Sequence, residues 1–340
     1  MRSSLFFALI LTVNLFGQNE WRGARPETGA KYASIPDKFR EYKVILEPEK
    51  NEPEWWAGAP SVARSEDGTF WLAARMRTAD SPRGLRGYEI RILRSKDGIH
   101  FTHVHSIRRE DVPIPGFERP ALIVDPHTKK FRLYGCGPWQ DGPWSIFKFT
   151  DADAPDQIDP ASAQPVIQPV PKRYERDIVA LSYKDPVIIY AENAYHCYVT
   201  GYVRQNERLF HFKSQDGIRW EPVGEINQPV MDLNGWHNFF IRPASILPLG
   251  IGYLFIYEGS STNWYDPVYN IGTGFGFTFD LHNIIELTTD SPLANRTTPG
   301  KFHTFRYSHW LWVDGEIWVY AEVARENDSN EIRLFRIKIK

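Results

Sequence analysis

The sequence has few sulfur-containing residues. Among 340 residues it has two cysteines, Cys136 and Cys197, and three methionines. No His/Cys cluster has the spacing of a zinc site. Two cysteines can form one disulfide, but both lie in strand-like segments and can equally be buried free thiols. The sequence therefore predicts no metal and no cofactor, and leaves open a structural cation on the axis of a radial fold.

Excess charge of one sign and long hydrophobic runs are also lacking. The net charge is −2 and no long Lys/Arg run exists, which excludes the electrostatic footprint of a nucleic-acid-binding protein. An apolar run at residues 5–16 follows Met1-Arg2-Ser3-Ser4. This run is too short to span a membrane. A basic start followed by a short apolar run is typical of a secretory signal. We expect a signal peptide at 1–17, export to the periplasm or the medium, and no membrane insertion.

A proline returns along the chain in the same local setting. The copies are Gly58-Ala59-Pro60-Ser61-Val62, Glu118-Arg119-Pro120-Ala121-Leu122, Lys184-Asp185-Pro186-Val187-Ile188 and Ile241-Arg242-Pro243-Ala244-Ser245, with a degenerate fifth copy at Phe305-Arg306-Tyr307-Ser308. Successive copies lie roughly 60 residues apart, a period typical of radial repeats. Five such units fill the chain.

Strand-like sequence lies inside each unit. Aromatic and β-branched runs such as 70–74 and 195–199 follow the motif copies, and Asp67-Gly68 is typical of a hairpin turn. A second repeated element, at 95–101 and 214–220, places Ser, Asp and Gly at matching positions. Since these residues cap and shape turns, we expect this element to be structural.

These patterns predict the fold class and the domain limits. We expect an all-β protein, a five-bladed β-propeller that forms a single domain at 41–340 after an N-terminal arm at 18–40. Residues 42–46 are expected to add a closing strand to the last blade. Residues 151–168, which are polar and contain proline, are expected to form a loop between blades.

The residues just before the prolines would converge on the axis of such a fold. They are Glu118, Arg119, Asp185, Arg242 and Arg306, a charged ring that a purely structural core rarely tolerates. Arginines in this place either bind a carboxylate or sulfate group of a ligand or neutralise the neighbouring acids. The sequence leaves both roles open.

The motifs resemble those of the five-bladed β-propeller glycoside hydrolases, a superfamily that includes arabinanases, β-xylosidases and exo-galactanases. The resemblance covers essentially the whole mature chain. Lys184-Asp185-Pro186 looks like the modulating aspartate of the arabinanase branch, and Glu118-Arg119-Pro120 resembles an active-site motif of the exo-galactanase branch. The chain departs from the arabinanase pattern at Ala59, where a base is expected, and at Ile241-Arg242, where an acid is expected. The resemblance implies a divergent member.

Glycoside hydrolysis needs carboxyl groups on both sides of the scissile bond. We predict Glu118, Asp185 and Glu258 as the catalytic groups, with Glu54 and Glu322 as alternatives. The predicted substrate-binding residues are Arg119, Arg242, Arg306, Trp56 and His237.

Together these features predict an exported, exo-acting glycoside hydrolase. Its substrate would be a plant or algal type of polysaccharide or oligosaccharide that can carry uronic or sulfated sugars, and the resemblance favours inversion. The alternatives are a non-catalytic carbohydrate-binding propeller and a lyase or phosphorylase on the same scaffold. Sugar identity, linkage and oligomeric state leave no signal in the sequence.

Overall fold

The computed structural model describes residues 38–169, 180–203, 205–224, 228–295, 298 and 301–338. The chain divides into two units, 1–41 and 42–340, and the strands of the described residues all lie in the second. The predicted signal peptide at 1–17 and most of the predicted arm fall outside the described residues. Within the described part, no helix is long and apolar enough to cross a membrane.

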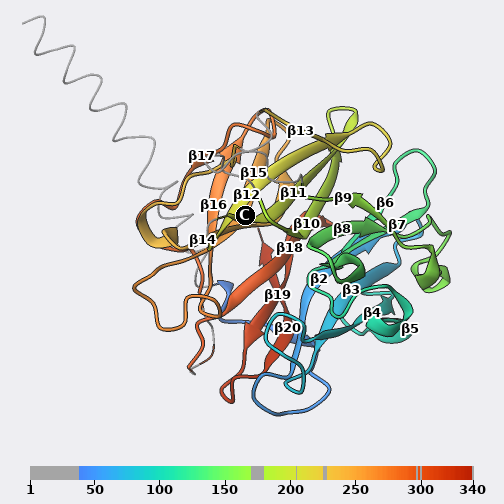
Figure 1. The fold of residues 1–340 in the computed structure, drawn as a ribbon, viewed down its shortest axis with the longest axis horizontal. Helices are drawn as coiled ribbons and strands as arrows, with labels where there is room; N and C mark the ends of the chain where they lie inside the picture. Colours follow the sequence, from blue (N-terminus) through green and yellow to red (C-terminus); the bar gives the residue numbers. More distant parts are fainter. Residues whose placement is uncertain are drawn as a thin grey trace, which may run out of the picture. The chain divides into compact units, whose positions relative to one another are not determined.

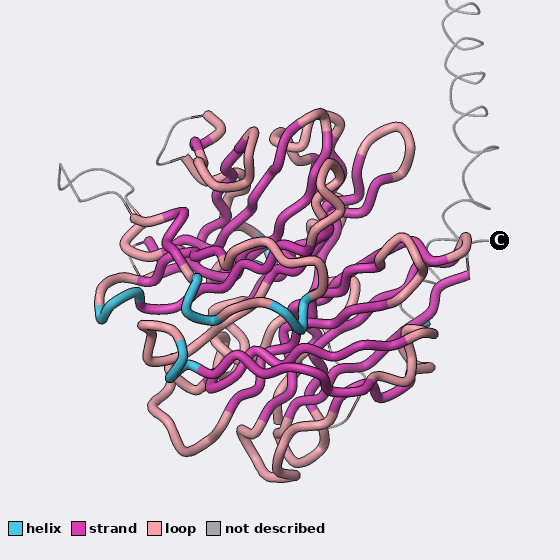
Figure 2. The backbone as a smooth tube through the Cα atoms, turned by 90° about the vertical axis from the view of Figure 1, so that its right-hand side faces the viewer, coloured by secondary structure: helices cyan, strands magenta, loops and turns pink. Residues whose placement is uncertain are grey.

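The described chain is built from strands and very short helices. The strands are β1 (Lys43–Leu46), β2 (Trp56–Arg64), β3 (Phe70–Arg77), β4 (Gly87–Ser95), β5 (Thr102–Arg108), β6 (Ala121–Val124), β7 (Phe131–Pro138), β8 (Trp144–Lys148), β9 (Gln164–Ile167), β10 (Tyr183–Ala191), β11 (Ala194–Val203), β12 (Asn206–Ser214), β13 (Glu221–Pro222), β14 (Phe240–Pro248), β15 (Tyr253–Ser260), β16 (Gly272–Thr278), β17 (Ile285–Glu286), β18 (Phe305–Val313), β19 (Glu316–Ala324) and β20 (Asn330–Lys338). The 3-10 helices are η1 (Arg109–Asp111), η2 (Trp139–Asp141), η3 (Pro155–Gln157), η4 (Pro160–Ser162) and η5 (Gly235–His237). Figure 2 shows strands dominating the described backbone. The predicted all-β class is confirmed.

Antiparallel pairing runs in successive groups along the chain, which Figure 1 follows by colour. We number the groups from first to fifth: β2–β5, β6–β9, β10–β13, β14–β17, and β18–β20 with β1. Two parallel residue pairs join neighbouring groups. The fifth group is joined to the first by Trp56 and Asn330, and the third to the fourth by Glu207 and Phe240. The first strand of each group contacts the first strand of the next, and β18 contacts β2.

Two predictions about strands can be judged here. β1 pairs antiparallel with β20, as expected of a strand that closes the last group. The prediction of a loop over 151–168 is wrong in part, because Gln164–Ile167 forms β9 against β8. Pro165 lies in this strand, which is the last in its sheet. Proline is tolerated there, because an edge strand has N–H groups that need no ladder partner.

Apolar cores lie between neighbouring groups. The core between the second and third groups contains Cys136 and Cys197, together with aromatic residues such as Tyr134, Tyr183 and Phe210. Both cysteines are buried and free, and burial raises the pKa of each thiol well above its ordinary value. The open question of a bridge is therefore settled in favour of free thiols.

The repeated proline motif coincides with an irregularity at the start of the first strands. The pairing register shifts between Gly58 and Ser61, between Lys184 and Val187, and between Arg306 and His309. At these bulges Ala59, Asp185 and Tyr307 have φ values of 48°, 56° and 50°, in a left-handed region that non-glycine residues rarely adopt. The fifth copy has no proline, and Tyr307 holds the position that precedes the proline in the other copies.

The turn at the outer hairpin is structural, as predicted. Ser95 Oγ accepts from the Gly98 N–H at 2.9 Å, and Asp97 Oδ1 accepts from the following N–H groups. Residues 214–219 repeat these bonds. Each turn also accepts a hydrogen bond from a tyrosine of the preceding group: Tyr320 Oη donates to Gly98 O at 2.6 Å and Tyr134 Oη to Gly217 O at 2.8 Å.

A third copy of this turn was not recognised in the sequence. Asp280 accepts from the N–H groups of the residues that follow it, and Tyr198 Oη donates to Leu281 O. Leu281, with φ of 64°, stands where the other copies have glycine. Three tyrosine-to-turn hydrogen bonds therefore join successive groups.

Removing one of these hydroxyls should weaken the join between groups. Tyr134→Phe and Tyr320→Phe each leave a buried carbonyl without its donor, and should each lower the free energy of unfolding by about 1–2 kcal/mol. Tyr265→Phe, at an exposed position, should change it by less than about 0.5 kcal/mol. Denaturant unfolding measures all three. Equal, negligible effects at the three positions would contradict the role assigned to the bonds.

Candidate active site

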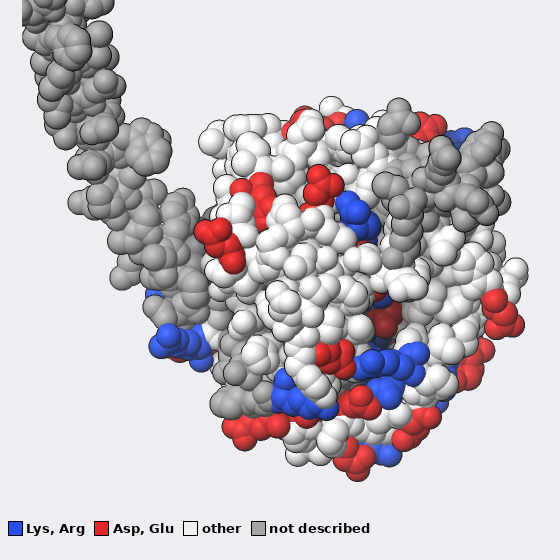
Figure 3. Space-filling view, turned by 60° about the vertical axis from the view of Figure 1, so that its left-hand side comes forward, with Lys and Arg blue, Asp and Glu red and all other residues white. Residues whose placement is uncertain are grey.

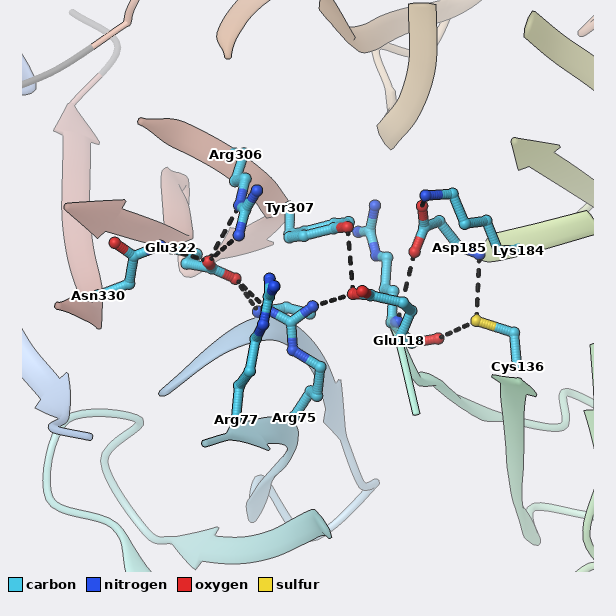
Figure 4. Close-up of polar contacts among 12 residues, drawn as sticks. Arg75, Arg77, Glu118, Cys136, Lys184, Asp185, Arg306, Tyr307, Glu322 and Asn330 are labelled. Carbon is cyan, nitrogen blue, oxygen red and sulfur yellow. Dashed lines mark hydrogen bonds and ion pairs between the residues drawn. The ribbon is translucent and has the colours of Figure 1, made fainter. Parts of the chain in front are cut away.

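The ends of strands from the first, third, fourth and fifth groups, together with the segment just before β6, bring charged side chains together in what we call the central cluster. Its members are Arg75, Arg77, Glu118, Arg119, Lys184, Asp185, Glu207, Arg242, Glu258, Arg306 and Glu322. Six are basic and five are acidic. Figure 4 shows part of the cluster, with Arg75 between Glu118 and Glu322. Register explains the Arg306–Glu322 ion pair, because these residues lie opposite each other, and it also places Glu258 opposite Arg242.

Glu322 is the most fully paired carboxylate of the cluster. It accepts from Arg306 Nη2 at 2.7 Å, from Arg75 Nη2 at 2.9 Å and from Asn330 Nδ2 at 2.6 Å. Burial would raise its pKa, but Arg306 and Arg75 outweigh burial and the pKa is lowered. A carboxylate with this many donors is ionised and weakly basic.

Glu322 also occupies the position where the sequence departs from the arabinanase pattern. Its Oε2 accepts from the Ala59 N–H at 3.0 Å. A Cβ on Gly58 would overlap the same oxygen, so only glycine fits at that position. A carboxylate is thus present beside Ala59, but it comes from β19 and is held by arginines.

Glu118 is the acid of the cluster that retains some exposure. It pairs with Arg75, and Tyr307 Oη donates to it at 3.5 Å. Its side chain is 11% exposed, against 0% for Glu322. Burial would raise its pKa, but Arg75 and Arg77 outweigh this and lower the pKa to about 2. Glu118 is therefore ionised at neutral pH.

Asp185 and Glu258 have the opposite tendency. Burial raises the pKa of Asp185, and the pKa of Glu258 rises to about 7 for the same reason. Asp185 Oδ1 accepts from the Arg119 N–H at 3.4 Å, and Glu258 Oε1 accepts from the Tyr307 N–H. The second oxygen of each acid is buried without a hydrogen-bond partner in the described part of the chain. The three predicted catalytic acids therefore lie in one cluster with unlike protonation.

The three predicted ligand-binding arginines all have partners inside the protein. Arg306 binds Glu322, and Arg242 Nε donates to Glu207. Glu207 also binds Lys184 Nζ at 2.7 Å. Arg119 donates to backbone carbonyls. Sequence reasoning missed Glu207, because β12 is the third strand of its group and carries no copy of the proline motif. The sequence offers only a weak signal, a charged residue at the second position of a strand that contains Leu209, Phe210 and Phe212.

Trp56 is part of the cluster's packing. The ring is 1% exposed, with the Arg77 guanidinium 4.0 Å and the Arg306 guanidinium 4.6 Å from its centroid. Tyr269 packs edge-on at 4.9 Å. Protein groups therefore contact the ring that was predicted to stack on a sugar.

His237 lies in η5, and its contacts are outside the cluster. Its Nε2 bonds Glu286 Oε1 at 2.7 Å, and its ring packs against Trp236 and Tyr257. The alternative acid Glu54 forms an ion pair with Arg86 at 2.9 Å. Neither is brought next to the cluster carboxylates by a described contact.

One side of the cluster is covered by a contact between loops. Arg83 Nη2 binds Asp266 Oδ2 at 2.7 Å, and its guanidinium lies 4.1 Å from the Tyr269 ring. Tyr269 Oη in turn accepts from Arg77 Nη2 at 2.7 Å. The Lys184 side chain, by contrast, is 20% exposed. Figure 3 shows acidic and basic atoms within a recess of one face. Among the described residues, no group of three or more His, Cys, Asp or Glu is arranged to hold a metal ion.

Neutralising Glu322 should destabilise the protein strongly. Glu322→Gln leaves two buried guanidinium groups without their shared counter-charge, so the free energy of unfolding should fall by about 3–5 kcal/mol. Glu316→Gln removes an ion pair with Arg336 near the surface and should cost far less, because ion pairs that solvent reaches contribute little to stability. Denaturant unfolding compares the two, and a similar small loss for both would contradict the pairing described here.

The protonation of Glu258 should make stability depend on pH. Its pKa is about 7 in the folded protein against an ordinary 4.5. Between these values the folded state binds more protons than the unfolded chain, so this acid contributes stability at low pH that is lost as pH rises toward 7. Glu258→Gln should flatten that decline in the unfolding free energy. Glu118→Gln should alter the pH dependence only below about pH 4.5, because its folded pKa is lowered. A decline unchanged in Glu258→Gln would refute the assignment.

Comparison with known proteins adds a fold relationship. No family model matches the chain, and no curated protein sequence matches it. Among solved structures, a complex of BT0996 with RGII is 13% identical with a TM-score of 0.65, and the match covers 91% of this protein and 96% of that one. The β-1,2-mannobiose phosphorylase of Listeria innocua is 13% identical with a TM-score of 0.61, covering 90% and 95%. A thermostable family-43 glycoside hydrolase is 15% identical with a TM-score of 0.61, covering 86% and 93%.

At these identities the likeness concerns the fold. The structures similar to this chain are glycoside hydrolases and phosphorylases of propeller type. The fold resemblance inferred from the repeated motif is therefore confirmed, and the chain has the fold of a propeller-type glycoside hydrolase.

Proposed function

We propose that residues 42–340 form a five-bladed β-propeller whose central cluster cleaves glycosidic bonds. Five groups of strands support the blade count, and the cycle of contacts among their first strands supports closure around an axis. The similar solved structures are carbohydrate-active enzymes, which supports an oligosaccharide or polysaccharide as substrate. The exported location rests on the apolar segment at 5–16.

The observation that carries this proposal is the gathering of three buried acids with unlike partners in one cluster. Glu118 pairs with Arg75, whereas one oxygen of Asp185 and one of Glu258 accept no hydrogen bond in the described part. Glu118 has a pKa of about 2 and Glu258 one of about 7. Environments that push two carboxyl groups apart in this way provide one acid and one base or nucleophile. We assign Glu118 as the ionised base or nucleophile and Glu258 as the proton donor. Asp185, with its raised pKa, modulates the pair.

Access to the proton donor limits how the reaction proceeds. Glu258 and Asp185 have no solvent exposure, whereas Glu118 and Lys184 retain some. Proton delivery therefore requires that the glycosidic oxygen come within hydrogen-bonding distance of the buried Glu258 carboxyl group, or that one water relay the proton. Glu118 is the ionised acid that keeps some exposure. It suits either of two roles, attack on the anomeric carbon or activation of a water beside it.

Two features support an exo-acting enzyme for acidic sugars. The Arg83–Asp266 contact covers one side of the cluster, so a glycan bound at Glu118 would extend to one side only. Basic groups outnumber acidic ones in the cluster, and Lys184 and Arg242 share Glu207 as their partner. A uronic or sulfated sugar would supply the missing negative charge through charge-assisted hydrogen bonds.

Phosphorolysis is the second candidate, and the same surplus of basic groups favours it. Phosphate would replace water as the attacking group, and its charge would need basic partners such as Lys184. A similar solved structure is named as a phosphorylase. Comparing turnover with and without inorganic phosphate separates the two reactions.

Activity of variants tests the assignment of roles. On acidic and neutral oligosaccharides, Glu118→Gln and Glu258→Gln should each lower kcat by about 10²–10⁴-fold. Wild-type activity should fall above pH 7, because the donor loses its proton there, and this basic limb should vanish in the residual activity of Glu258→Gln. The exposed Glu66→Gln should have wild-type activity. Binding of oligosaccharides without turnover would instead indicate a non-catalytic propeller, and turnover unaffected in both acid variants would rule out the cluster as the active site.

A further inference from the structure

Arg119 differs from the other arginines of the cluster in what its guanidinium group binds. Arg306 and Arg242 bind carboxylates. The Arg119 guanidinium instead donates to the backbone carbonyls of Pro243 at 3.1 Å, Ala244 at 2.5 Å and Ser308 at 3.4 Å. The residue is 2% exposed and precedes β6 in the second group. Its side chain therefore reaches the fourth and fifth groups.

These carbonyls need a donor because of the repeated bulge. The register shifts between Pro243 and Ser245 in β14 and between Arg306 and His309 in β18. Ala244 and Ser308 fall in these irregularities, where a strand residue is left outside the regular ladder. A buried carbonyl without a ladder partner costs free energy unless another donor bonds it. The guanidinium carries several donors in a rigid plane, so one residue can bond carbonyls of two strands.

The backbone of Arg119 is tied to the predicted catalytic acids. Arg119 directly follows Glu118, and its own N–H donates to Asp185 Oδ1 at 3.4 Å. Ser308 directly follows Tyr307, whose N–H donates to Glu258 Oε1. Arg119 therefore adjoins Glu118 in the chain, and it contacts the carboxyl group of Asp185 and the strand whose N–H group bonds Glu258.

We propose that Arg119 is a positioning residue, which sets the relative placement of the three predicted catalytic acids by binding the bulge carbonyls of β14 and β18. This role replaces the ligand-binding role that the sequence predicted. Its catalytic consequence rests on the proposed function, whereas its structural consequence can be measured without a substrate. Of the charged groups near Glu258, Arg119 lowers the pKa of this acid most. A change in the distance between Arg119 and Glu258 should therefore be visible in the titration of Glu258.

Infrared spectroscopy of protonated carboxyl groups across a pH series tests the placement. Few acids other than Glu258 should remain protonated near pH 7, and Glu258→Gln identifies its signal. In Arg119→Met the midpoint of that signal should move up by about 1 pH unit or more, because a nearby positive charge is lost. Arg119→Lys keeps that charge but cannot bond the carbonyls of both strands, so the smaller upward shift expected in Arg119→Lys reports the change in placement. Arg333→Met is the matched control: Arg333 is equally buried, but pairs with Glu331, and its loss should leave the midpoint unchanged.

Kinetics on a substrate of the wild-type protein supply the second readout. Misplacement of the acids should lower kcat by about 10²-fold in Arg119→Met with little change in KM, and Arg119→Lys should recover part of the loss. A rise in KM for anionic substrates alone, with kcat unchanged and with the infrared midpoint of Arg119→Lys unchanged, would show that Arg119 binds ligand and would overturn the proposal. So would an unshifted midpoint in both Arg119 variants.

The two proposals fail in distinguishable ways. If the wild-type protein turns over no glycoside, the proposed function fails while the infrared measurement still tests Arg119. If Arg119→Met does not fold, Arg119→Lys carries the test, because lysine keeps the charge and one ammonium group as donor. A wild-type midpoint and wild-type kcat in a folded Arg119→Lys protein would then overturn the positioning role.

Discussion

The structure depends on the need to compensate charges that lie inside an all-β domain. Eleven charged side chains gather where the first strands begin, and most have almost no exposed surface. Removing an ion from water costs several kcal/mol, and only close counter-charges and additional hydrogen bonds offset that cost. Glu322 and Glu207 meet this demand, because each lies between basic groups of two different strands. The strands of separate groups are thereby held at the centre by electrostatics as well as by apolar packing.

Some acids of the cluster are fully compensated by basic partners and others are not, and this difference favours a catalytic role for the second kind. Glu322 and Glu207 are bonded by two basic residues each, which makes them structural. One oxygen of Glu258 and one of Asp185 accept no hydrogen bond in the described part, and burial shifts both acids toward their neutral form. A protein that needed only stability would gain by pairing these oxygens or removing the acids. Together with left-handed backbone at Asp185 and Tyr307, the cluster has the local strain expected of a functional site.

The sequence predicted the architecture better than it predicted the site. Proline and Asp-Gly mark local backbone geometry that each segment adopts by itself, so the repeat, the first strands and the structural turns could be recognised. The third turn was missed because Leu281 adopts the conformation that glycine has elsewhere. β9 was missed because proline is tolerated at an edge. Pairings across the cluster, such as Glu322 with Ala59, depend on register and on side chains from distant strands. Motif spacing and composition carry no information about these pairings. For the same reason, the sequence could not distinguish Arg119 from the other arginines that were predicted to bind ligand.

The central claim is that glycosides react at the cluster, between Glu118 and Glu258. The most direct measurement is a crystal structure of the Glu118→Gln protein bound to an oligosaccharide that the wild-type protein cleaves. The account predicts the scissile glycosidic oxygen within about 2.6–3.2 Å of the Glu258 carboxyl or of one relaying water, with the anomeric carbon facing residue 118. An oligosaccharide bound productively at another surface, with the cluster free of sugar, would contradict it.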